Sequence, residues 1–295
     1  MKHAMLGAGG VGGLIGGLLA AAGDEVVLVL RPETLAGYPA ELRLERPTGA
    51  VTAPVRGVST LEEPVDVLWI ATKAPQLNDA LRRVRTPAER IGAVVPLLNG
   101  IDHVALLRER FGKQRVVAAT IAVETERTAA GQIVQRSPWV RLNITASGAS
   151  RLEPARAKLA AAGVEAQFVA DETTLLWSKL CFLAPIALAT TASGKTVGEV
   201  RGDAQWSARL YMAIQEACAV AAAEGAKVDA AKITATAESL PAGMRSSMQK
   251  DVGAGRAPEL DAIAGPILRG GKKHGVETPS CEQMVRAIQE KSHRG

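Results

Sequence analysis

The sequence predicts an α/β protein in which an N-terminal doubly wound sheet of the Rossmann type is followed by an all-helical C-terminal domain. Up to residue 170, short apolar runs typical of buried strands alternate with helical patterns, as in βαβ units. After residue 171 the chain shows almost only helical patterns. We therefore expect domains at 1–170 and 171–295, which a chain of 295 residues accommodates.

The chain opens with a strand, a glycine-rich turn and a helix. An apolar run at 4–6 leads into the spacing G-x-G-x-x-G, and a second strand is expected at 25–30. The first glycine of such a turn permits a tight bend, the second lets a pyrophosphate come close, and the third lets the helix pack on the strand. Open N–H groups at the helix start then bind the phosphates. The turn predicted to bind a dinucleotide comprises Gly7, Ala8, Gly9, Gly10, Val11 and Gly12.

A signal peptide or a membrane span is the competing interpretation of this stretch, because residues 4–23 carry no charge and follow Lys2. Eight of these twenty residues are glycine, however, and they fall at the dinucleotide spacing. The stretch also supplies the first strand of an otherwise coherent sheet. We therefore expect no membrane segment.

The end of the second strand bears on the choice between NADP and NAD. An NAD-binding fold places an acidic residue there, which binds the ribose 2′-hydroxyl. In this sequence Leu30 and Arg31 occupy that place, and an arginine suits the 2′-phosphate of NADP through a bidentate contact. The alternative is that Arg31 is a solvated loop residue and that Glu33 supplies the acid. We favour NADP(H) as the cofactor.

The rest of the first domain continues the alternation of strands and helices. A hairpin is expected at 42–55, and the continuous apolar run 65–71 is typical of a buried parallel strand. Further strands are expected at 92–98, at 116–123, as a pair within 131–144, and at 164–169. Helices are expected up to residue 84 after the 65–71 strand, at 101–111, and at 152–162.

Polar residues follow successive strands of the predicted sheet. Ligands of open α/β sheets bind beyond the carboxyl ends of the strands, where the glycine turn, Thr72-Lys73 and Asn99-Gly100 all fall. Each of these residues taken alone is more readily a surface loop residue, but their common placement favours ligand contacts. Lys73 can bind the 2′-phosphate edge or the diphosphate, and Asn99 can orient the nicotinamide ribose or the substrate.

The second domain is expected to contain six helices, and its apolar faces make a homodimer the default expectation. The first helix is long and apolar, with Pro185 as a kink. The expected helices span 173–191, 204–224, 229–240, 246–253, 258–274 and 278–291.

Composition limits the classes of partner. The net charge of +5 is mild, the basic residues are scattered, and 3 Phe, 2 Tyr and 4 Trp are too few for base-stacking platforms, so we expect no nucleic acid. Widely spaced cysteines without a C-x-x-C motif indicate a reducing, cytoplasmic compartment. The four histidines lack the spacing of metal ligands, so we expect no bound metal. These histidines are His3, His103, His274 and His293.

Lys179 is the one ionisable residue in the apolar segment 175–184. Apolar surroundings disfavour the ammonium form and lower the pKa of a lysine. Such a lysine can donate a proton to a carbonyl oxygen while hydride reaches the carbon. The alternative is a lysine that extends from a helix rim into solvent.

Two further residues of the second domain are candidates for ligand contacts. Ser247 and its neighbouring N–H groups are expected at a helix start, where a carboxylate is well received. Glu259 precedes an apolar helix and can equally be only an acid of its first turn.

Taken together, these motifs resemble the ketopantoate reductase (2-dehydropantoate 2-reductase) family along nearly the whole chain. No single motif is specific, but their order and spacing match. The matching pieces are the glycine turn, Arg31, Thr-Lys-Ala at 72–74, Asn-Gly at 99–100, Trp-x-Lys-Leu at 177–180, Ser-Ser-Met at 246–248 followed by Asp251, and Glu259 in Glu-x-Asp.

The resemblance implies NADPH-dependent reduction of a 2-oxo acid between two domains that face each other across a cleft. It implies that Lys179 protonates the ketone oxygen, that Glu259 lies beside Lys179 and the nicotinamide ribose, and that Ser247 binds the substrate carboxylate. It also implies that Asn99 holds the nicotinamide and the substrate, and that the glycine turn, Arg31, Lys73 and the backbone near Ala122 hold the cofactor.

Three positions depart from the family pattern. Members usually carry asparagines one and two helical turns after the lysine and a third before a Gly-Glu pair, and these line the pocket for the hydroxyl end of the substrate. This chain has Leu183, Ala187 and Val197 at those positions. Loss of hydrogen-bonding groups changes specificity strongly. We therefore expect a more apolar 2-oxo acid than ketopantoate to contact Leu183 and Ala187.

The expected function is thus NADPH-dependent reduction of a 2-oxo acid, either ketopantoate or a more apolar analogue. Two alternatives remain. One is a non-catalytic NADP-binding sensor, motivated by the missing asparagines. The other is a related 3-hydroxy acid or opine-type dehydrogenase.

Overall fold

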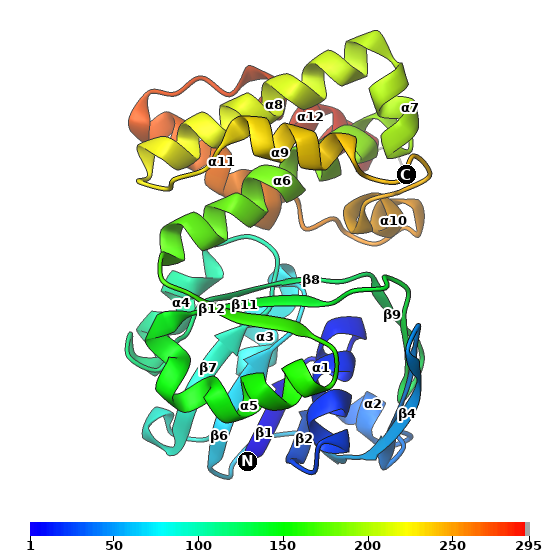
Figure 1. The fold of residues 1–295 in the computed structure, drawn as a ribbon, viewed down its shortest axis with the longest axis vertical. Coiled ribbons are helices and arrows are strands. Elements are labelled where there is room, and N and C mark those ends of the chain that lie inside the picture. Colours follow the sequence, from blue (N-terminus) through cyan, green and yellow to red (C-terminus); the bar gives the residue numbers. More distant parts are fainter. Residues whose placement is uncertain (293–295) are drawn as a thin grey trace. The chain divides into compact units, whose positions relative to one another are not determined.

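The computed structural model describes residues 1–292, and Figure 1 shows its ribbon with most of the elements labelled. The chain forms two compact units. The first consists of Met1–Leu98 and His103–Glu172, and the second of Asn99–Asp102 and the chain from Thr173 onward. The segment Asn99–Asp102, which we expected in the first domain, therefore groups with the helical unit.

The first unit is built on a five-stranded parallel sheet of strand order β5-β2-β1-β6-β7, which confirms the predicted Rossmann-type core. The central strand β1 is flanked by β2 and β6, so the carboxyl ends of these three strands meet at one edge of the sheet. The strands are β1 (Lys2–Leu6), β2 (Glu25–Val29), β5 (Arg56–Val58), β6 (Val65–Ile70) and β7 (Ile91–Pro96).

The other strands do not extend this sheet, as a single doubly wound sheet would require, but form two smaller ones. One has the order β4-β3-β10-β9 and the other the order β12-β11-β8. The expected hairpin at 42–55 is β3–β4. Strand β9 was not expected, because four of its five residues are exposed and its one strand partner within residues 1–292 is β10. The bounds are β3 (Glu41–Arg46), β4 (Gly49–Pro54), β8 (Ala119–Ala122), β9 (Thr125–Ala129), β10 (Gln132–Gln135), β11 (Arg141–Thr145) and β12 (Glu165–Val169).

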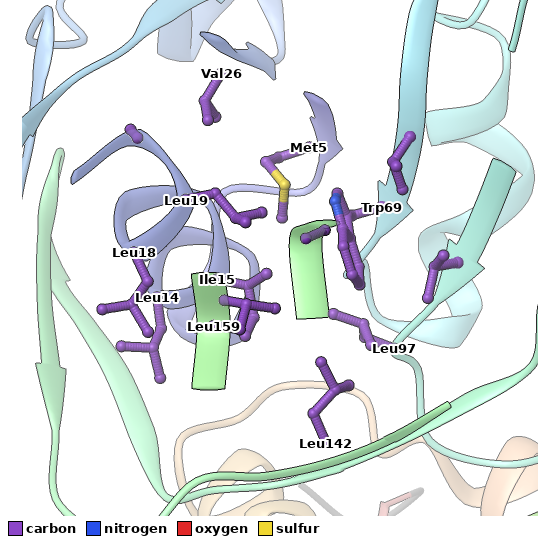
Figure 2. Packing of buried hydrophobic residues seen from close by; sticks show 14 of the residues in the cluster. Met5, Leu14, Ile15, Leu18, Leu19, Val26, Trp69, Leu97, Leu142 and Leu159 are labelled. Atoms are coloured by element: carbon purple, nitrogen blue, oxygen red, sulfur yellow. The ribbon is translucent and has the colours of Figure 1, made fainter. Parts of the chain in front are cut away.

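Helix α1 (Gly10–Ala21) packs between the parallel sheet and the β4-β3-β10-β9 sheet. A Cβ atom on Gly13 would lie 2.5 Å from the Ile133 side chain in β10, and one on Gly16 would lie 3.0 Å from Met5 in β1. Glycines therefore let both sheets approach the helix. Figure 2 shows side chains of α1, β1, β6 and α5 meeting in the resulting core. The uncharged stretch 4–23 is accordingly a packed strand and helix.

Short helices complete the first unit. They are α2 (Pro32–Leu35), α3 (Leu77–Leu81), α4 (His103–Phe111) and α5 (Ala149–Ala161), with 3-10 turns at Ala74–Gln76, Ala88–Arg90 and Ala146–Gly148.

Within the first unit, a buried network of hydrogen bonds is centred on His3. The Trp69 indole N–H donates to His3 Nδ1 at 3.2 Å, so the proton of the neutral imidazole lies on Nε2, 3.2 Å from Asp24 Oδ2. Lys158 Nζ donates to the other Asp24 oxygen at 2.6 Å. Burial lowers the pKa of His3 despite the nearby carboxylate. Burial alone would raise the pKa of Asp24, but hydrogen bonds from Lys158, the amino terminus and His3 bring it below its usual value.

We expect the free energy of unfolding to fall as pH drops below about 6.5, because His3 then binds a proton more readily in the unfolded chain than in the folded one. The Asp24 contribution has the same sign and is lost below about pH 4.

Asp24→Asn should lower the free energy of unfolding by about 2 kcal/mol near pH 7, and this difference should become smaller in acid. Urea unfolding over this pH range measures both effects. Asp79→Asn, which breaks an exposed pair with Arg83, is the control, and parallel pH curves for wild type and Asp24→Asn would contradict the prediction.

The second unit is all-helical, as predicted. Its core gathers apolar side chains from α6, α8, α11 and α12. An additional helix, α7, begins with a capping box in which Thr196 and Glu199 bind each other's backbone N–H groups. The helices are α6 (Glu172–Ser193), α7 (Val197–Gly202), α8 (Ala204–Ala223), α9 (Ala230–Glu238), α10 (Ser247–Gly253), α11 (Leu260–His274) and α12 (Pro279–Ser292).

Helix α6 is long and apolar enough to span a membrane, but the fold already accounts for its composition. Its most apolar 18-residue window is 72% buried within the structure. Buried residues include Trp177, Leu180 and Cys181 before Pro185, and Leu188 after it. The helix is therefore the central core helix of the second unit.

Candidate active site

The glycine turn has the geometry that a dinucleotide requires. Gly7 adopts a φ of +102°, which favours glycine, and a Cβ atom there would lie 2.9 Å from the backbone of Ala71 and Thr72. A Cβ atom on Gly12 would lie 2.0 Å from the Gly7 carbonyl oxygen. At Gly9, by contrast, a Cβ atom would meet no atom within 4 Å, so space for a ligand is open. No side chain of the described residues caps α1, so its first N–H groups face this space and fit a pyrophosphate.

Arg31 lies next to this turn in the sheet. Strand β2 pairs with β1 in the register Leu6–Val29, and Arg31 is the second residue beyond Val29. Its side chain is exposed and makes no hydrogen bond or ion pair with any residue between 1 and 292. Glu33, the acid of the NAD alternative, is also exposed, in the first turn of α2. The guanidinium is therefore available to an anionic ligand.

The chain that leaves β6 passes on the other side of the glycine turn. The hydroxyl oxygen of Thr72 is buried and has no hydrogen-bond partner among the described residues, which is unusual for a buried polar group unless a ligand or water supplies one. Lys73 follows and is half-buried. Ala122 ends β8, three residues before Thr125, whose hydroxyl lies 3.5 Å from the Gly10 carbonyl.

In the helical unit, Lys179 lies half-buried in the second turn of α6, between the buried Trp177 and Leu180. Burial lowers its pKa from 10.5 to about 8, and the negative charge of Glu259 opposes this shift. The ammonium makes no hydrogen bond or ion pair within the part of the chain that the structure describes. Glu259, only 8% exposed, directly precedes α11. The lysine can therefore hold or release a proton near neutral pH.

Asn99 reaches the same place from another part of the sequence. Its Nδ2 atom lies 3.4 Å from Glu259 Oε2. Gly100 has a φ of +84°, and a Cβ atom there would lie 2.3 Å from the Ala262 carbonyl oxygen, so the loop packs directly on the first turn of α11. The structure thus brings together Lys179, Glu259 and Asn99, three residues that we had selected separately.

Ser247 is not joined to this group by any contact that involves its side chain. It is exposed and is the first residue of α10, while the buried Ser246 caps that helix by accepting from the Gln249 N–H at 3.1 Å. The Ser246 hydroxyl lies 2.8 Å from the hydroxyl of Thr190, three turns beyond Lys179 on α6. We expected Ser247 at the start of this helix but did not identify Ser246 as its cap. The capping-box spacing S-x-x-Q, in which Ser246 precedes Gln249 by three residues, could have identified this cap from the sequence.

The three positions that depart from the family pattern have different environments. Leu183 is partly exposed, whereas Ala187 and Val197 are 1% and 2% exposed and belong to the core of the helical unit. The expectation that Ala187 contacts substrate is thus not supported by its position in this structure. Gly198, retained from the pattern, has a packing role, because a Cβ atom there would lie 2.6 Å from the Cβ of Ala242.

Among residues 1–292, no group of three or more His, Cys, Asp or Glu side chains could hold a metal ion. His293, one of the histidines considered above, lies outside the described residues. The three cysteines are free and buried.

Comparison with known proteins agrees with these features. The family described as "Ketopantoate reductase PanE/ApbA" matches residues 3–149, and its C-terminal counterpart, "Ketopantoate reductase PanE/ApbA C terminal", matches residues 172–292. The chain belongs to the ketopantoate reductase family. A 2-dehydropantoate 2-reductase of Caulobacter vibrioides is 32% identical to it, with 96% of each chain covered. The resemblance drawn from the motifs is thus confirmed, and the protein is an oxidoreductase of this family.

Solved structures share the complete two-unit architecture. A PanE/ApbA family ketopantoate reductase from Ralstonia eutropha JMP134 is 28% identical and has a TM-score of 0.87, with 100% of this chain and 99% of that chain covered. A ternary structure of D-mandelate dehydrogenase with NADH and anilino(oxo)acetate has a TM-score of 0.88 at 24% identity, with 100% and 99% covered. The second likeness concerns the fold alone.

Proposed function

We propose that this member of the ketopantoate reductase family reduces a 2-oxo acid to the 2-hydroxy acid with NADPH, and that Lys179 donates the proton. The observation that carries the proposal is the placement of Lys179. It is a half-buried lysine with a pKa of about 8, beside Glu259 and Asn99, in a family of reductases. NADPH supplies the hydride when it is bound.

In this proposal the residues of the chain divide the work. The glycine turn and Arg31 bind the dinucleotide, with Thr72 and Lys73 beside them. Lys179 transfers its proton to the ketone oxygen as negative charge develops there. Glu259 stabilises the ammonium form electrostatically and holds the Asn99 amide. Asn99 and Ser247 would orient the substrate, as the family resemblance implies.

The substrate we propose carries an apolar group in place of the hydroxyl end of ketopantoate. Leu183, one helical turn after Lys179, offers an accessible apolar side chain where the family has an amide. D-mandelate dehydrogenase, which shares the fold, has been solved with anilino(oxo)acetate, so this fold accommodates a ligand with an aromatic ring. Enzymes that lack a hydrogen-bonding group for a substrate hydroxyl lose the corresponding discrimination.

A substrate panel tests this function. With NADPH, apolar 2-oxo acids are expected to give a higher kcat/KM than ketopantoate. The rates are measured from the decrease in NADPH absorbance. Leu183→Asn should shift the ratio of kcat/KM values toward ketopantoate by about fivefold, because one restored hydrogen bond is worth about 1 kcal/mol. Leu240→Asn, at a partly buried position next to the same core, is the control.

No turnover of any 2-oxo acid, together with tight NADPH binding, would instead favour the non-catalytic sensor. Turnover of 3-hydroxy acids or of an amino acid with a 2-oxo acid would favour the other dehydrogenase classes. We further propose a cytoplasmic enzyme, in keeping with its three free thiols, and a homodimer formed by the helical unit.

A further inference from the structure

The loop that carries Asn99 is tied to helix α11 by a charged contact. Arg269, on the third turn of α11, contacts Asp102 through Nη2 and Asp261 through Nη1, the latter at 2.7 Å. Asp102 ends the four-residue segment that begins with Asn99, and Asp261 is two residues after Glu259. One guanidinium therefore bridges the loop of Asn99 and the helix start next to Glu259.

Helix α11 is shaped to let this guanidinium lie along it. Asp261, Gly265 and Arg269 are spaced by four residues and so share one face of the helix. A Cβ atom on Gly265 would lie 2.5 and 2.6 Å from the two terminal nitrogens of Arg269. Glycine is unfavourable inside a helix, yet here its missing side chain makes the room in which the guanidinium lies. The bridge is thus built into the helix and is not a chance surface pair.

We propose that Arg269 is a positioning residue that holds Asn99 against Glu259 and thereby sets the arrangement of both beside Lys179. This inference rests on the proposed function, because it concerns the same site. Arg269 does not touch the three residues itself. It acts through Asp102, whose contact ties the loop to α11, whereas its contact with Asp261 lies within α11. The close packing of Gly100 on Ala262 lies between the bridge and Asn99, so a shift of the loop reaches Asn99 directly.

The expected effect is moderate because the bridge is exposed. The side chains of Arg269, Asp102 and Asp261 are 54%, 56% and 84% exposed. Exposed ion pairs contribute little and weaken with salt. We expect Arg269→Gln and Asp102→Asn to lower kcat about fivefold at low ionic strength, with the KM for NADPH unchanged. High salt should bring the wild type close to the variants.

Two variants separate positioning from helix stability. Gly265→Ala should favour the helix but push the guanidinium away, so it should lower kcat as Arg269→Gln does. Asp261→Asn removes only the contact within α11 and leaves the contact to the loop, so it should change kcat less than about twofold. Arg286→Gln, which breaks an exposed pair with Glu282 on α12, is the control for loss of surface charge.

A second readout does not depend on turnover. Glu259 raises the pKa of Lys179, so loosening Glu259 should lower that pKa and increase labelling of Lys179 by an amine-reactive reagent near pH 7. Peptide mass spectrometry measures this labelling with or without a known substrate. Increased labelling in Asp102→Asn, Arg269→Gln and Gly265→Ala, but not in Asp261→Asn, supports the proposal. Unchanged labelling in all four, or equal changes in Asp102→Asn and Asp261→Asn, would overturn it. If no 2-oxo acid is reduced, the proposed function fails while the labelling still tests the positioning.

Discussion

Lys179→Ala is expected to lower kcat for 2-oxo acid reduction about 10³-fold, the middle of the range that general acids contribute. The variant loses the ammonium beside Glu259 that we propose as the proton donor to the ketone oxygen. NADPH affinity should change less than about twofold, because the cofactor contacts that we propose lie mainly in the first unit. Steady-state kinetics and fluorescence titration with NADPH measure the two quantities separately.

Lys232→Ala serves as the matched control, because Lys232 is a lysine of the same unit whose side chain is 85% exposed. It should retain wild-type kinetics. Retained turnover in Lys179→Ala would remove Lys179 from the mechanism. A parallel loss of NADPH binding would instead indicate that the lysine supports the cofactor.

The pH dependence of wild-type kcat provides a further check on Lys179. Reduction requires the ammonium form, so the rate should fall as pH rises through about 8. The reverse oxidation requires the neutral amine, so its rate should rise over the same interval. Glu259→Gln removes the charge that raises this pKa and should move both transitions to lower pH. Transitions that stay in place in this variant would contradict the electrostatic role of Glu259.

Local sequence predicted the conformation of the glycine turn. The glycine turn is recognisable because each glycine answers a local need, such as the positive φ of Gly7 or the close contact between Gly12 and Gly7. The βαβ alternation predicted the parallel sheet of the first unit but not its strand order β5-β2-β1-β6-β7, because strand order depends on which distant strands pair. Strand β9 was not predicted, because its mostly polar residues show no period-two pattern of apolar side chains.

The helical half of the site depends on contacts between distant parts of the chain. Asn99 and Glu259 are 160 residues apart, and no local pattern states that they meet. The bridge from Arg269 to Asp102 spans 167 residues, and we did not predict it from the sequence. The burial of Ala187 could not be predicted from the sequence either, because an alanine on α6 is compatible both with a pocket wall and with the core.

Arg31→Ala is expected to weaken NADPH binding about 50-fold and NADH binding less than about threefold. Hydrogen bonds to a charged group are worth about 1.5–3 kcal/mol, and only NADPH offers a 2′-phosphate to a guanidinium. Arg31 is exposed at the end of β2, and its side chain makes no hydrogen bond or ion pair within residues 1–292, so removal of the side chain should leave the fold intact. Dissociation constants for NADPH and NADH, measured at two salt concentrations, give the ratio of the two affinities and show how much of the preference is electrostatic.

Glu33→Gln is the matched variant, because Glu33 lies two residues away and is the acid that an NAD-binding role would use. If the chain prefers NADPH, removing this carboxylate should leave NADPH binding unchanged or slightly tighter, since a negative charge near the phosphate is lost. If Arg31→Ala weakens both cofactors equally while Glu33→Gln weakens NADH, the acid binds the ribose and the preference is for NAD. The two substitutions remove opposite charges beyond the end of the same strand, and together they distinguish a preference for NADPH from a preference for NADH.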